Sequence, residues 1–282
     1  FCGTLKIAAD VVFPVLHGTF GEDGTVQGFL EVLDIPYIGA GVLGSAIGMD
    51  KETSKRLWLH AGLPVVPFIT AYGETHSDRK EAAKLVMEAE SKFGYPLFVK
   101  PACTGSSVGV SRVDSRSEFH GALMEAFKYD TKALVEPGIT GKEVECSVIG
   151  NRRVRSFTPG QIIPTHGHAF YDYDAKYIDP DGAKLVIPAD ISITQRKEVR
   201  EIAEKAFSIA GAEGMARVDF FVEEPSGKIL LNEMNTIPGF TSISMFPMLC
   251  AADGLSMRDL ITELIQMGMD RYQQRHKLCY SK

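Results

Sequence analysis

Two apolar strands joined by a short turn constrain the fold more than any other feature of the sequence. The strands cover residues 216–222 and 228–235, and the turn at 225–227 reads Pro-Ser-Gly. Proline suits the first position of such a turn, and glycine suits the position that requires a positive φ. The sequence therefore predicts an antiparallel hairpin with a three-residue loop, in which Glu224 pairs with Lys228.

That pairing gathers polar side chains on one face of the hairpin. Asp219 then lies opposite Glu233, and Arg217 opposite Asn235, because side chains alternate between the faces of a strand. Facing carboxylates repel each other unless a cation lies between them, and carboxylate and amide oxygens suit Mg²⁺. A solvated face with splayed carboxylates is the alternative; the arginine and the Gly- and hydroxyl-rich loop 236–244 favour a metal and anion site. The other face is predicted to join a core through Val218, Phe220, Val222, Leu230 and Met234.

Two lysines lie where a triphosphate could bind. Lys100 ends the apolar strand 97–100, immediately before the Gly- and Ser-rich segment 104–109. An ammonium group at the end of a buried strand is costly without an anionic partner, which a phosphate would supply. The alternative is a lysine that reaches solvent above an ordinary turn. Lys51, near a predicted helix start, is a second candidate, although alone it would be typical of a surface lysine.

Two glutamates lie at the ends of other predicted strands. Glu136 ends the apolar strand 133–136, and Glu143 begins the strand 143–150. Carboxylates at such a hinge could accept hydrogen bonds from an adenine amino group and from ribose hydroxyls. Surface carboxylates at strand ends are an equally good interpretation of these two residues alone.

Gly39, Gly41 and Gly44 match the G-x-G-x-x-G pattern of dinucleotide-binding proteins. That pattern requires a preceding strand and an acid roughly 20 residues on, at the end of a second strand. Here Pro36 interrupts the first strand, and the candidate second strand, 65–70, ends without an acid. We therefore interpret the glycines as a flexible turn between two lobes, which leaves a NAD-dependent oxidoreductase as a remote alternative.

The order of the predicted elements indicates an α+β protein. Strands and helices alternate irregularly, and a long loop is expected at 159–185. The 282 residues carry a net charge of −6 without a long basic run, so no nucleic-acid partner is expected. No apolar stretch reaches the roughly 20 residues that span a membrane. The five scattered cysteines favour reduced thiols in a cytoplasm over a disulfide framework or a zinc site.

Together, these stretches resemble the D-alanine–D-alanine ligases, a family of ATP-grasp enzymes, over almost the whole chain. The most specific stretch is 171–177, Tyr-Asp-Tyr-Asp-Ala-Lys-Tyr, whereas the hairpin and the two lysines alone would indicate only the wider ATP-grasp class. The other similar stretches are 16–24, 49–51, 99–109, 216–219 and 232–242. The resemblance implies an ATP-grasp fold with a truncated N-terminal Rossmann-like lobe, divided into residues 1–39, 40–138 and 139–282.

The resemblance also implies the activity, which is ATP-dependent ligation of two D-alanines through an acyl phosphate for peptidoglycan precursors, in a cytoplasmic homodimer. The residues implied to bind ATP are Lys51, Lys100, Ser107, Glu136, Ile139, Glu143 and Lys176. Those implied to bind two Mg²⁺ ions, for which Mn²⁺ can substitute, are Asp219, Glu233 and Asn235. Those implied to surround the D-alanines or stabilise the oxyanion are His17, Ser106, Tyr177, Arg217, Gly239 and Ser244. The loop 159–185, with His166 and His168, would close over the site.

Three other functions stay open at this stage. Another ATP-grasp ligase would lack the stretch 171–177, a D-alanine–D-lactate ligase would differ at Tyr177, and a non-catalytic nucleotide-binding module would have lost ligands. The family also has a glutamate before the His-Gly loop that binds the ammonium of the first D-alanine, and here that region would precede Phe1. We expect an upstream segment in the complete protein. We also expect that a polypeptide that begins at Phe1 binds nucleotide but ligates poorly.

We predict that D-alanine is the acceptor and that D-lactate is strongly rejected near neutral pH. Tyr177 is implied to hydrogen-bond to the Ser106 hydroxyl beside the acceptor, and each buried polar group left unpaired costs about 1–3 kcal/mol. The measurement is the ratio of dipeptide to depsipeptide formed from mixed D-alanine and D-lactate, for wild type and Tyr177→Phe. A wild type that makes mostly depsipeptide would contradict the assignment, and an unshifted ratio in the variant would remove Tyr177 from it.

Overall fold

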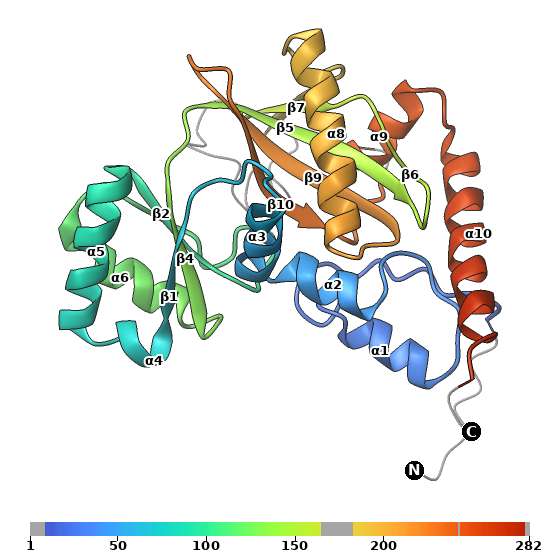
Figure 1. Ribbon diagram of the computed structural model, residues 1–282, viewed down its shortest axis with the longest axis horizontal. Helices are drawn as coiled ribbons and strands as arrows, with labels where there is room; N and C mark the ends of the chain where they lie inside the picture. The colour runs from blue at the N-terminus through green and yellow to red at the C-terminus, as the bar shows by residue number, and fades with distance from the viewer. Residues whose placement is uncertain (1–8, 165–182, 242, 280–282) are drawn as a thin grey trace.

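Two antiparallel sheets form the frame of the computed structural model, which describes residues 9–164, 183–241 and 243–279 (Figure 1). The smaller sheet has four strands, in the order β1 (Ile69–Tyr72), β4 (Lys132–Pro137), β2 (Leu97–Pro101) and β3 (Ser111–Val113). Helices α5 (Arg79–Phe93) and α6 (Arg116–Ala126) pack on this sheet, and short α4 (Gly73–His76) follows β1. Their apolar residues, such as Leu85 and Leu123, share one buried core with Val99 of β2.

The larger sheet belongs to the second half of the chain. Its strands are β10 (Ile229–Asn235), β9 (Gly214–Glu223), β5 (Gly141–Gly150), β7 (Gly160–Pro164) and β8 (Ala183–Val186), with β6 (Val154–Ser156) on β5. Helix α8 (Ile193–Ile209) packs against it in one core, and α9 (Met245–Ala252) and α10 (Met257–Arg275) pack in another. Both cores draw on this sheet because alternate residues of its strands face opposite ways: Val218 joins the first and Met215 the second.

Helix α3 (Lys51–His60) lies between the two sheets and is tied to both (Figure 1). Asp50 caps its first turn by accepting from the Thr53 N–H at 3.0 Å. From β4 of the smaller sheet, the Lys132 ammonium lies 2.6 Å from a carboxylate oxygen of Asp50 and 2.8 Å from one of Glu52. At its other end, the fully buried indole of Trp58 donates to the Ala206 carbonyl of α8 at 3.0 Å.

The segment before the first sheet holds α1 (Thr25–Val32) and α2 (Val42–Met49). Among the described residues, strand pairing within this segment consists of one parallel bridge between Val12 and Tyr37. The Arg271 guanidinium of α10 holds this segment by donating to the carbonyls of Tyr37 and Gly39 and by lying 4.3 Å from the centre of the Tyr37 ring. A buried arginine with backbone acceptors thus ties α10 to this segment.

The predicted α+β class is confirmed, and the remaining differences have physical causes. The flexible glycine turn is wrong, since α2 begins at Val42 and includes Gly44. The long loop 159–185 is wrong at both ends, which form β7 and β8. The strand expected at 65–70 is divided: Val65 forms a bridge with Leu231 of β10, and only its end joins β1. The domain boundaries at 39/40 and 138/139 stay a prediction. Among the described residues, none of the helices carries an apolar stretch of membrane-spanning length.

We predict that Gly44→Ala destabilises the protein although alanine favours a helix. A Cβ at this position would lie 2.8 Å from the Ala212 Cα and 2.8 Å from the Gly211 carbonyl oxygen, so backbone would have to move. Such overpacking costs about 1–3 kcal/mol. The control is Gly28→Ala in α1, where the nearest atom would be 3.9 Å away; there alanine should stabilise by about 0.5–1 kcal/mol. Urea unfolding measures both, and a stabilising Gly44→Ala would contradict the packing.

Candidate active site

A cavity of about 640 Å³ lies between the two sheets, within the roughly 300–1,000 Å³ range of small-molecule sites. Both sheets, the start of α3 and the segment 104–107 contribute to its wall. Eleven of the predicted site residues line it: Lys51, Lys100, Ser106, Ser107, Glu136, Ile139, Glu143, Arg217, Asp219, Glu233 and Asn235. The structure therefore brings together residues that are far apart in the sequence.

The predicted hairpin register is confirmed at the end away from the turn. Asp219 lies opposite Glu233 and Arg217 opposite Asn235. Near the turn the prediction is wrong by one residue, because Val222 pairs with Ile229 and the loop is longer than expected. A bulge between Leu231 and Glu233 restores the register, with Asn232 as the extra residue.

The same bulge changes which side chains enter the core. Leu231 lies opposite Phe220 and joins the core with it, whereas Leu230 lies opposite Phe221 on the other face. The prediction that Leu230 faces the core beside Phe220 is therefore wrong, although its side chain is buried. The extra residue in one strand flips the alternation for the part of the strand between the bulge and the turn.

Three acids lie in one row across adjacent strands. Glu145 of β5 is opposite Asp219 of β9, which is opposite Glu233 of β10. Arg217 donates to both carboxylate oxygens of Asp219, at 2.8 and 2.7 Å, and its Nε lies 3.2 Å from Glu145. Burial would lower the pKa of Arg217, but the two carboxylates outweigh it and raise that pKa, so the guanidinium stays charged. The Asn235 amide also donates to Asp219, at 2.9 Å.

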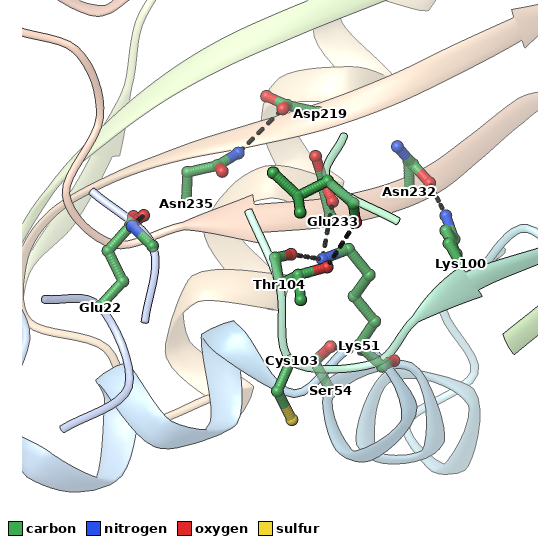
Figure 2. Close-up of polar contacts among 12 residues, drawn as sticks. Glu22, Lys51, Ser54, Lys100, Cys103, Thr104, Asp219, Asn232, Glu233 and Asn235 are labelled. Carbon is green, nitrogen blue, oxygen red and sulfur yellow. Dashed lines mark hydrogen bonds and ion pairs between the residues drawn. The ribbon is translucent and has the colours of Figure 1, made fainter. Parts of the chain in front are cut away.

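The donor set at this row fits Mg²⁺. Asp219 and Glu233 offer carboxylate oxygens on one face, and the Asn235 amide nitrogen is turned to Asp219 (Figure 2). Within the described ranges, no group of three or more His, Cys, Asp or Glu side chains could hold a metal ion. A site here would therefore use two carboxylates and an amide and would need further oxygens, as Mg²⁺ bound to a phosphate substrate does. Metal binding itself stays a prediction.

Two lysines line the cavity and reach neighbouring residues of β10, Lys51 from α3 and Lys100 from β2. Figure 2 shows the Lys51 ammonium between the Thr104 carbonyl, at 2.5 Å, and the Glu233 carboxylate, at 3.5 Å. Lys100 of β2 reaches Asn232 at 3.2 Å and Glu136 at 2.6 Å. Each ammonium thus has acceptors that a phosphate oxygen could replace, which suits the predicted phosphate role.

The segment beside Lys51 has an unusual backbone. Ser106 and Ser107 have φ values of 54° and 59°, a region that side chains with a Cβ rarely adopt. Such conformations cost of order 1–3 kcal/mol each and are typical of ligand-binding segments. Together with Gly105, which approaches Gly18 closely enough that an added Cβ would lie 3.5 Å from its Cα, they close one side of the cavity.

The sequence motifs do not single out Lys55, which is fully buried in the structure. Lys55 has an exposed fraction of 0%, and its ammonium lies 2.5 Å from one carboxylate oxygen of Glu136. Its position four residues after Lys51 on the same helix was the available signal, since such residues share a helix face. Burial would raise the pKa of Glu136, but Lys100 and Lys55 outweigh it and hold that pKa below its usual value. Glu136 is therefore an ionised acceptor.

Glu22 is a second residue that the sequence did not single out. It lies in the loop after His17, and burial raises its pKa. Its carboxylate accepts from the Gly18 N–H at 2.8 Å and from the Ile237 N–H at 3.0 Å. Glu22 thus ties the His17 loop to the loop that follows Asn235.

Three other predicted residues lie at the margin of the cavity or beyond it. The His17 ring nitrogen lies 2.9 Å from the Ile237 carbonyl oxygen, and Ser244 precedes α9 and accepts from the Thr241 N–H at 3.0 Å. Gly239 lies against Ser244, because an added Cβ would be 2.7 Å from its hydroxyl. Lys176 and Tyr177, with His166 and His168, lie outside the described residues.

The cavity lies between two antiparallel sheets and is lined by lysines and facing acids. This arrangement is that of an enzyme of the ATP-grasp class. Two family models match the sequence: "D-ala D-ala ligase C-terminus" over residues 57–266 and "D-ala D-ala ligase N-terminus" over residues 2–40. The chain therefore belongs to the D-alanine–D-alanine ligase family.

Individual relatives agree with this assignment. Over 272 residues the chain is 50% identical to a D-alanine–D-alanine ligase of Treponema denticola, covering 96% of this chain and 73% of the relative. It is 49% identical to D-alanine–D-alanine ligase A of Escherichia coli K12, covering 93% and 70%. A solved D-alanine–D-alanine ligase from Coxiella burnetii superposes with a TM-score of 0.83 at 40% identity, covering 96% and 71%. A D-Ala:D-Ser ligase from Enterococcus faecalis gives 0.81 at 38%, covering 93% and 74%.

We predict that Lys100→Ala weakens ATP binding at least about tenfold, since a charged hydrogen bond is worth about 1.5–3 kcal/mol. The fold should persist because Glu136 keeps the Lys55 ammonium. Titration calorimetry measures the affinity, and circular dichroism checks the fold. The control is Lys84→Ala on α5, an exposed lysine that pairs with Glu81 at the surface. Unchanged ATP affinity in a folded Lys100→Ala variant would show that this lysine is merely structural.

Proposed function

We propose that this enzyme joins two D-alanine molecules into D-alanyl-D-alanine, with ATP as the energy source, for peptidoglycan precursors. The observation that carries the proposal is the pairing of lysines with a row of facing acids around one cavity, in a chain of this ligase family. A carboxylate is a poor electrophile, so the γ-phosphoryl group of ATP first transfers to the carboxylate of one D-alanine. The amine of the second D-alanine then attacks the acyl carbon, and phosphate leaves.

The chain's own cations would hold and neutralise the triphosphate. Lys51 and Lys100 both line the cavity, and each would exchange a protein oxygen for a phosphate oxygen. Catalysis of phosphoryl transfer depends chiefly on such positioning and charge neutralisation. The backbone at Ser106 and Ser107 would contribute N–H donors, and Glu143 would accept from the ribose.

Asp219, Glu233 and Asn235 would hold Mg²⁺, for which Mn²⁺ can substitute. When bound, the ions neutralise charge on the transferring phosphoryl group. In this structure Arg217 and Lys51 lie against the same carboxylates, so the protein itself already balances part of their charge. That balance allows two acids to face each other before any ligand arrives.

Arg217 and the Gly239 N–H would stabilise the oxyanion of the tetrahedral intermediate, where one donor is typically worth roughly 3 kcal/mol. Ser244 precedes α9, and the N-terminus of a helix favours an anion such as the acceptor's carboxylate. His17 would lie near the first D-alanine.

A homodimer is proposed from the family alone, and the free thiols of Cys103, Cys146 and Cys250 support a reducing cytoplasm.

We predict that ADP release requires both D-alanine and Mg²⁺, stops with EDTA and returns with Mg²⁺ or Mn²⁺. Asp219→Asn should lower kcat at least about a hundredfold, because it weakens a ligand that positions the phosphoryl group. Coupled ADP release and chromatography of the products measure the two steps. The control is Glu224→Gln on the exposed hairpin turn.

Three outcomes would contradict this function. ATP turnover without a dipeptide would favour a different ATP-grasp reaction. A product that contains mainly D-serine in the second position would move the chain toward the specificity named for the Enterococcus faecalis relative. Equal loss of activity in Asp219→Asn and Glu224→Gln would remove the metal role from Asp219.

A further inference from the structure

Lys55 is a charged side chain that the proposed mechanism does not use. It lies on α3 one turn after Lys51, yet Lys51 lines the cavity whereas Lys55 is fully buried beneath it. Its ammonium is 2.5 Å from Glu136 and 5.9 Å from the centre of the Phe68 ring. A buried ammonium is costly unless an opposite charge pairs with it, and apolar residues in place of such a pair are often neutral or stabilising, so the pair points to a role other than stability.

The Glu136 carboxylate pairs with two ammonium groups, one that lines the cavity and one that is fully buried. One oxygen of Glu136 faces Lys55, and the other lies 2.6 Å from Lys100. Lys100 reaches into the cavity and also donates to Asn232, so a phosphate can draw it away. Lys55 is fully buried and is not among the residues that line the cavity. When Lys100 turns to a phosphate, Lys55 therefore keeps Glu136 paired, ionised and in place.

The surroundings of Glu136 suit the edge of a flat base. Phe98 lies directly opposite Glu136 in the ladder between β2 and β4, so both side chains point to the same side of the sheet. Phe98 and Ile139 give apolar walls to the cavity beside this carboxylate. An ionised carboxylate accepts a hydrogen bond from an amino group and repels an oxo group.

We propose that Lys55 is a positioning residue that sets base specificity, because it holds Glu136 in the ionised form that selects a 6-amino purine over a 6-oxo purine. The inference rests on ATP being the nucleotide of the proposed function. It concerns nucleotide binding alone, so it can be tested without the ligase reaction. Lys55 acts through Glu136 and does not touch the nucleotide.

The test compares the affinities for ATP and ITP by titration calorimetry in the absence of D-alanine. Lys55→Met keeps the length of the side chain and removes its charge. We expect the wild type to prefer ATP, and the variant to lose at least about tenfold of that preference, the worth of one charged hydrogen bond. The control is Ser54→Ala, at a neighbouring buried residue of α3 whose hydroxyl donates to the Lys51 carbonyl of its own helix. The nucleotide preference of this variant should change less than about twofold.

A second pair of variants covers the case in which Lys55→Met does not fold. Lys55→Met with Glu136→Gln removes both charges, which a buried pair tolerates better than the loss of one partner. If Lys55 acts through Glu136, the double variant and Glu136→Gln alone should show the same ratio of ATP to ITP affinity. A different ratio, an equal loss of both nucleotides in Lys55→Met, or a wild type without preference for ATP would each overturn the inference. A failed ligase assay would contradict only the proposed reaction.

Discussion

Repulsion among like charges is the constraint on which the site depends. Glu145, Asp219 and Glu233 lie in one row on three adjacent strands, a spacing at which carboxylates destabilise a sheet. The structure balances them with Arg217 from the same sheet and Lys51 from α3. Because Lys51 comes from outside the sheet, the docking of α3 adds to the stability of the acid row. The charge balance of the acid row and the packing of α3 between the two sheets are thus coupled.

Helix α3 links the two sheets because each of its ends is anchored to a different part of the molecule. One end is held to the smaller sheet by Lys132, and the other is buried against α8 through Trp58. Between these anchors, Lys51 and Lys55 extend toward the acids of the larger sheet and of the hinge. Because the helix is fixed at both ends, its ammonium groups are already positioned before a ligand binds. Binding of a phosphate would then cost little additional conformational entropy.

Much of the hairpin was predictable because a strand's alternation is local. The opposition of Asp219 and Glu233 followed from counting back from the turn, yet two errors cancelled in that count. The loop is one residue longer than the Pro-Ser-Gly sequence suggests, and the bulge at Asn232 compensates for it. A bulge depends on the neighbouring strands and segments, here including the bridge from Val65 to Leu231, and no local pattern announces it.

The sequence by itself determined the class of fold, the two lysines at element ends, and the acids and arginine on one strand face, because periodicity and side-chain chemistry are local properties. Only the tertiary structure decided the partners of those groups. Lys55 and Glu136 are separated by 81 residues and Glu22 and Ile237 by 215, and no periodicity extends over such distances. Burial decided which charges need a partner: the desolvation of Lys55 makes the loss of Glu136 alone costly, whereas in the sequence Lys55 is one lysine among many.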